Sequence, residues 1–154
     1  MQWSEVVDNP YLENLPFKIE LSRYGKIEMT PASNKHGRLQ LRLGALLDRK
    51  LKHGEALTEC SVQTTEGVKV ADVAWCSKSF IKQHGYATPY ISAPDICVEI
   101  VLPSNSKEEM THKVQLYLQA GAKEVWIIWE NGIIDYYNAA GTLEQSDYSV
   151  TVKL

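Results

Sequence analysis

Three acidic residues lie in segments whose other residues are typical of buried strands. Asp95 and Glu99 belong to "APDICVEIVL", and Asp72 lies within "VKVADVAW". Burying an unpaired carboxylate is costly, so a chain that places acids in its core supplies them with a cation, a proton or a metal ion. Because side chains alternate along a strand, we expect Asp95 and Glu99 to point to the same face of the sheet.

Lys113 is the candidate cation. It belongs to the segment after the Glu99 strand, where Met110, Val114 and Tyr117 form an apolar face at 100° per residue. Lys113 lies among these apolar positions rather than on the opposite, polar face. An isolated lysine there would extend along the helix flank toward solvent. Because a strand of acids immediately precedes this helix, we expect Lys113 to point inward, at the acids.

Two acids on adjacent strands with a nearby lysine suit the hydrolysis of a phosphodiester. Hard carboxylate oxygens hold Mg²⁺ or Mn²⁺, and the ion lowers the pKa of a bound water that the lysine can orient or deprotonate. The alternative is a buried ion-pair cluster of Asp72, Glu99 and Lys113 that titrates abnormally and catalyses nothing.

The elements that carry these residues alternate between hairpins and helices. A short helix interrupted at Pro10 is expected within 4–16, and three hairpins are expected around residues 24–25, 66–67 and 131–132. Two long helices are expected, one from a capping Ser33 to near Gly54 and one from Ser106. Glu109 completes a capping box with Ser106.

The other expected elements are a short helical segment in "KSFIKQHG", the strand at 95–102 and an edge strand in "SDYSVTVKL". The pattern predicts an α+β fold, a sheet with a long helix against each face.

Composition limits the class of protein. A chain of 154 residues, 44% hydrophobic and 23% charged, fits one domain spanning 1–154. The longest apolar run is "VWIIW", so no membrane span is expected, and three widely spaced cysteines favour the cytoplasm. The net charge of −3 means that nucleic-acid binding would need a local basic patch or bound cations.

Several separated segments resemble, in the right order, the Uma-two family of restriction endonucleases, part of the PD-(D/E)XK nuclease superfamily. They are "LPFKIELSRYGKIEMTPASNKHG", "KVADVAW", "APDICVEIVLPSNSKEEMTHKVQLYLQAGAKEVW" and "IIDYYN", spread from about Leu15 to Asn138. The resemblance implies a restriction-endonuclease-like fold, a central mixed sheet flanked by helices, and a Mg²⁺-dependent site.

The resemblance also implies roles for single residues. Asp72 matches the acid of the family's proline-aspartate motif, although Ala71 stands in place of the proline, and Glu99 matches the acid of the E-x-x motif. Both would be metal ligands. Glu20 matches an early glutamate and would assist them.

The lysine position of the superfamily, two residues after Glu99, holds Val101. Lys113 matches a family lysine on the following helix and would take over the role of positioning water. Asp95, on the predicted face of Glu99, would support the site from behind.

Basic residues gather on the first long helix. Between positions 35 and 52 there are six basic residues against one acid, among them Lys35, Arg38 and Arg42. Such a run is usually a solvated helix face; on a DNA-binding protein it would contact phosphates. His36 lies on the apolar side of this helix, where a hydrogen-bonded structural histidine is expected.

These observations favour a Mg²⁺- or Mn²⁺-dependent DNA endonuclease with Asp72, Glu99, Lys113 and Glu20 at its site. The alternative is a noncatalytic nuclease-fold module that binds DNA or another protein. In either case the chain could work as a homodimer.

Overall fold

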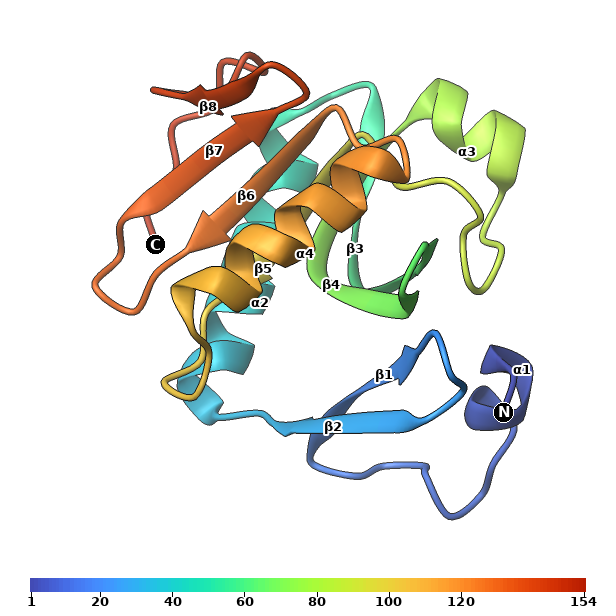
Figure 1. The fold of residues 1–154 in the computed structure, drawn as a ribbon. Coiled ribbons are helices and arrows are strands. Elements are labelled where there is room, and N and C mark those ends of the chain that lie inside the picture. Colours follow the sequence, from blue (N-terminus) through green and yellow to red (C-terminus); the bar gives the residue numbers. More distant parts are fainter.

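The computed structural model describes residues 1–154 and has the predicted α+β architecture (Figure 1). The helices are α1 (Trp3–Val7), α2 (Asn34–Lys50), α3 (Lys78–His84) and α4 (Lys107–Gln119). The strands are β1 (Phe17–Ser22), β2 (Ile27–Pro31), β3 (Gly54–Thr64), β4 (Gly67–Ser77), β5 (Ile96–Ile100), β6 (Glu124–Ile128), β7 (Ile134–Asn138) and β8 (Gly141–Leu143). No helix has the length and apolar character needed to cross a membrane.

All the strands belong to one mixed sheet in the order β2-β1-β4-β5-β6-β7-β8, with β3 paired to β4. Only β5 and β6 pair in parallel, and α4 is the crossover that joins them. The three predicted hairpins are present as β1–β2, β3–β4 and β6–β7.

A long helix covers each face of the sheet, with α4 in front and α2 behind in Figure 1. On the α4 side, Met110, Val114 and Tyr117 pack in one apolar cluster with Cys97 of β5. On the α2 side, helical leucines pack with Ile96, Val98 and Ile100 of the same strand. The strand therefore alternates as predicted, and Glu99 belongs to the face that α4 covers.

Local hydrogen bonds set where the two long helices begin. The Ser33 hydroxyl accepts the backbone N–H of His36 at 3.1 Å. Ser106 and Glu109 form the predicted capping box, with distances of 3.1 and 3.0 Å. Each cap satisfies donors that a helix end leaves free, and so fixes the positions of residues one or two turns further on.

Two predicted elements differ from the structure. The first helix ends at Val7, before Pro10 is reached. The predicted edge strand at 146–154 is wrong: that segment has no strand, and β8 forms the edge instead. The Ser146 hydroxyl and the Asp147 N–H bind the buried Glu124 side chain, and Ser149 has a φ of 56°, so the chain turns away from the sheet edge there.

The sheet forks along one edge of β4. β3 pairs with the other edge over its whole length: Gly54 faces Ser77 at one end, and Thr64 faces Gly67 at the other. On the fork edge, β1 pairs with Gly67 and Val68 only, and β5 pairs with 73–75. Residues 69–72 lie between these two pairings, where β1 diverges with β2 and α1 from the rest of the sheet (Figure 1).

Candidate active site

Carboxylates satisfy the backbone groups that the fork leaves without strand partners. The Val70 N–H donates to Glu20 Oε1 at 2.9 Å, and the Ile100 N–H donates to Asp72 Oδ2 at 2.7 Å. A buried N–H without an acceptor is costly, so each of these bonds holds its carboxylate in the fork. Both acids are more than nine-tenths buried.

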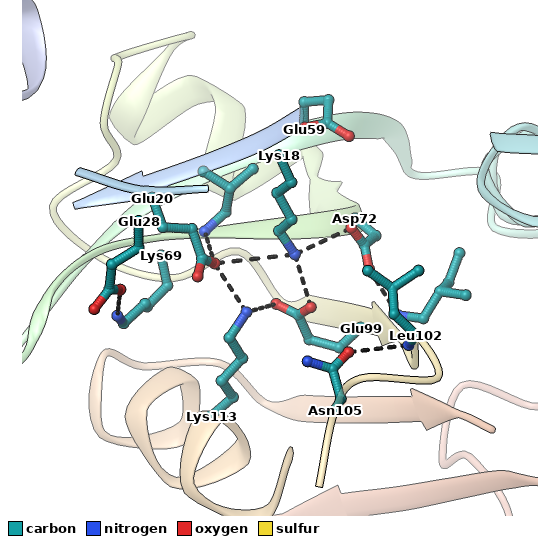
Figure 2. Close-up of polar contacts among 12 residues, drawn as sticks. Lys18, Glu20, Glu28, Glu59, Lys69, Asp72, Glu99, Leu102, Asn105 and Lys113 are labelled. Carbon is teal, nitrogen blue, oxygen red and sulfur yellow. Dashed lines mark hydrogen bonds and ion pairs between the residues drawn. The ribbon is translucent and has the colours of Figure 1, made fainter. Parts of the chain in front are cut away.

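Lys18, which was not among the predicted site residues, lies at the centre of the fork. The Lys18 Nζ is 2.8 Å from Glu99 Oε2, 3.1 Å from Asp72 Oδ1 and 3.9 Å from Glu20 Oε1. Lys18 itself is only 9% exposed. Figure 2 shows its ammonium enclosed by carboxylates that come from three different strands.

Lys113 points inward from α4, as its place on the helix predicted. Its Nζ is 2.9 Å from Glu20 Oε1 and 3.4 Å from Glu99 Oε1 (Figure 2). One turn along the same helix, the Tyr117 hydroxyl donates to Glu99 Oε1 at 2.7 Å. We refer to Lys18, Glu20, Asp72, Glu99 and Lys113 as the carboxylate–lysine cluster.

Helix α2 holds Asp72 from the other face of the sheet. His36 is buried, as expected of a structural histidine, and its Nε2 is 3.2 Å from Asp72 Oδ1, an ion-pair distance when the imidazole is protonated. The Gln40 amide donates to the Asp72 carbonyl at 2.8 Å and also to Glu59. Glu59 has a φ of 52° and lies where the β3–β4 register is interrupted opposite Asp72.

Burial and the neighbouring charges shift the pKa values of the cluster residues in different directions. Burial opposes ionisation of Asp72 and Glu20, but the neighbouring cations outweigh it and lower the pKa of both carboxyls. Burial also opposes the charge on Lys18, yet Glu99, Asp72 and Glu20 together raise its pKa. For Glu99 burial dominates over Lys113 and Lys18, so its pKa is raised. Glu99 therefore differs from Asp72 and Glu20 in the direction of its shift, although both lysines are close to it.

The donor set suits a hard divalent ion. Asp72, Glu20 and Glu99 offer only carboxylate oxygens, the ligands that Mg²⁺ and Mn²⁺ prefer. Nowhere in the chain are three or more His, Cys, Asp and Glu side chains already arranged around a common metal position. At the fork the cation among the oxygens is the Lys18 ammonium. The chemistry of the oxygens fits the ion, and Lys18 occupies the space between them.

Asp95 does not join the cluster, which corrects its expected role behind Glu99. Its carboxylate accepts the Ser77 N–H at 2.8 Å and pairs with Lys123 at 3.2 Å. Asp95 precedes β5, and Glu99 lies four residue steps further along the strand, a distance of about 13 Å. A shared face of a strand does not bring together residues so far apart along it.

The signal for Lys18 was present in the sequence. In "FKIELS" the side chains of Lys18 and Glu20 share one face of the strand, so the assignment of Glu20 implied a nearby lysine. A lysine in an amphipathic strand is normally solvated, so the sequence alone did not indicate that Lys18 is buried.

Lys35, Arg38 and Arg42 are exposed on α2 and form no ion pair. With Arg49 they span about 60° of the helix circumference, and the three arginines lie about 120–160° from His36. Near the start of the helix, a cavity of about 210 Å³ lies between α2 and the segment after β5. His36, Leu102 and Trp129 are among its lining residues.

The fork in a mixed sheet, the helix on each face and the acids from adjacent strands together define a nuclease-type fold of the restriction-endonuclease class. The chain belongs to the Uma2 (Uma-two) family, described as "putative restriction endonuclease", whose model matches residues 3–151. Among curated proteins, none matches the chain significantly.

One solved structure supports the fold independently. It is the crystal structure of a "putative nuclease belonging to DUF820" from Anabaena variabilis ATCC 29413. The two chains are 22% identical with a TM-score of 0.74, over 99% of this chain and 89% of the other. At this identity the likeness shows the shared fold.

Proposed function

We propose that this protein is a Mg²⁺- or Mn²⁺-dependent DNA endonuclease that hydrolyses phosphodiester bonds at the carboxylate–lysine cluster. One observation carries the proposal: carboxylates from three strands converge at the fork on a buried lysine, with a second lysine from α4 beside them. Membership of a restriction-endonuclease family supports the same class of reaction.

Asp72 and Glu99 would hold the metal ion, because they are the most deeply buried acids of the fork. When bound, the ion would supply a water of lowered pKa and charge to stabilise the oxygens of the phosphate. His36 and Gln40 hold Asp72 in orientation from behind. An orienting contact of this kind commonly tunes a carboxylate ligand.

Lys113 is the candidate for positioning water. Its Nζ donates to Glu20 and Glu99, so the ammonium is held in one place while its side chain stays 18% exposed. From there it can orient a water and balance the negative charge that develops on a phosphate. Glu20 assists by holding Lys113 and is itself held by the Val70 N–H.

The substrate would be DNA, bound through its phosphates by Lys35, Arg38 and Arg42 on α2, in the cytoplasm. A homodimer would bring two such sites to one duplex. Sedimentation of the protein with and without a DNA duplex would measure that assembly.

Supercoiled plasmid incubated with the protein and Mg²⁺ or Mn²⁺ tests the proposed activity. We expect nicked and linear products from the wild type and a loss of at least about a hundredfold in Asp72→Asn. Asp95→Asn is the matched control, because Asp95 is a buried, ion-paired acid outside the cluster. A folded wild type that binds DNA and leaves it intact would contradict the proposal and favour the noncatalytic module.

A further inference from the structure

The two lysines of the cluster do not have equivalent partners. Lys113 contacts two carboxylates and reaches them from the helix, at the edge of the fork. Lys18 lies within 4 Å of all three carboxylates, and its side chain is 8% exposed against 18% for Lys113. Lys18 is therefore the internal counterion of the fork.

The oxygens that Lys18 holds are the ones a metal ion would need. Glu99 Oε1 already accepts from Lys113 and Tyr117, and Asp72 Oδ2 accepts the Ile100 N–H. The remaining oxygens, Glu99 Oε2 and Asp72 Oδ1, both face the Lys18 ammonium, and Asp72 Oδ1 also lies 3.2 Å from His36 Nε2. A divalent ion bound by these two acids would compete directly with Lys18.

A displaced Lys18 would need another anion. A buried ammonium without a counter-charge is strongly disfavoured, and the flexible four-carbon stem of lysine allows the charge to move a few ångströms. On a nuclease, the phosphate of the bound strand is the anion that arrives at the site. A shift of Lys18 from carboxylates to phosphate would leave every charge paired.

We propose that Lys18 is a built-in cation that occupies the metal position until DNA arrives, and that it then transfers to a substrate phosphate as the metal ion binds. This inference rests on the proposed function and adds regulation to it: metal and DNA bind cooperatively. Each ligand then raises the affinity for the other by the same factor.

The first test is Mn²⁺ binding without DNA, measured by calorimetry on the wild type, Lys18→Met and Lys69→Met. Lys69 is the matched control, a buried lysine on β4 that pairs with Glu28 outside the cluster (Figure 2). We expect Lys18→Met to bind Mn²⁺ at least about tenfold more tightly, because the competing charge is gone. Lys69→Met should stay within about twofold of the wild type.

The second test adds a short DNA duplex, with Ca²⁺ as the ion so that binding is read separately from cleavage. DNA should tighten Ca²⁺ binding to the wild type, and Lys18→Met should lose this enhancement. Lys18→Arg retains the charge and should keep the weak metal binding of the wild type in the absence of DNA. Equal tightening in the Arg and Met variants would overturn the inference.

If Lys18→Met unfolds without metal, we expect Mn²⁺ to restore its fold, because the ion replaces the lost cation. A failure to refold, or metal binding no tighter than in the wild type, would overturn the role of Lys18. In that case cleavage by the wild type would leave the nuclease function standing. Absence of both cleavage and divalent-ion binding in the wild type would remove the proposed function and this inference together.

Discussion

Two neighbouring strands of the sheet each bury a glutamate, and the donors around the two side chains differ in kind. Glu99 on β5 and Glu124 on β6 are both 2% exposed. Glu124 accepts from the Trp126 indole, the Ser146 hydroxyl and the Asp147 N–H, each at 2.7 Å. Glu99 accepts from two lysine ammonium groups and the Tyr117 hydroxyl.

Under the proposed function, this difference separates a structural carboxylate, Glu124, from a metal ligand, Glu99. The donors to Glu124 are neutral groups fixed in the chain, so nothing in solution can take their place. The ammonium groups at Glu99 sit on flexible stems, and the one at Lys18 is the cation that we propose a metal ion replaces. Burial alone does not distinguish the two residues, whereas the charge and mobility of their partners do.

The largest expected effect on stability is at Glu124. Glu124→Ala removes the acceptor of three buried donors and should lower the free energy of unfolding by about 3 kcal/mol or more. Urea unfolding, followed by tryptophan fluorescence, measures the loss. Glu124→Gln keeps the shape and one acceptor oxygen and should lose less.

Mn²⁺ provides the control for this comparison. We expect Mn²⁺ to stabilise the wild type, and this response should persist in Glu124→Gln, because the Glu124 carboxylate takes no part in the cluster. Loss of the Mn²⁺ response in that variant would show that the two glutamates are not separate sites.

An intermediate effect is expected at Lys113. Lys113→Met keeps much of the side-chain volume, and Glu20 and Glu99 retain the Val70 N–H, Lys18 and Tyr117 as partners. We therefore expect a stability loss of only about 1–2 kcal/mol and a drop in plasmid cleavage of about a hundredfold or more. Metal binding should be retained.

Two measurements, cleavage rate and urea unfolding, separate the alternatives for Lys113. Cleavage at the wild-type rate in Lys113→Met would remove Lys113 from the proposed reaction. A large stability loss combined with an inactive parent protein would instead make the cluster a structural ion-pair network. Its role would then be structural, as that of Glu124 is, although its partners are charged.

Local patterns predicted the parts of the site that depend on one element. The capping residues Ser33 and Ser106 specify where α2 and α4 begin, because the bonds involved span three residues. Helical periodicity then gave the direction of Lys113, and alternation along β5 gave the face of Glu99. Each of these features follows from the geometry of a single helix or strand.

The fork could not be predicted in this way, because it depends on pairings between distant segments. Leu21 pairs with Val68, and Val73 pairs with Val98. The gap between these pairings decides that Lys18 is buried rather than solvated. The strand predicted at 146–154 failed for a similar reason, since Glu124 holds the start of that segment in a turn. Long-range partners decide both outcomes: they bury Lys18 in a strand that forms as predicted, and they override strand propensity at 146–154.

The smallest effect on stability is expected on α2, where the charges are exposed and no other residue depends on them. Replacing Arg38, Arg42 and Arg49 with alanine should change the free energy of unfolding by less than about 0.5 kcal/mol. If this stripe contacts phosphates, the triple variant should bind DNA more weakly, and its salt dependence should fall by up to about three phosphate contacts. Because these three arginines face away from His36, the phosphates that they contact would flank the one that is cut.

Replacing the exposed Lys78, Lys82 and Lys153 removes the same charge elsewhere and is the matched control. If both triple variants keep the wild-type salt slope measured by fluorescence anisotropy, the α2 stripe is a solvated surface, and DNA must reach the fork by another face.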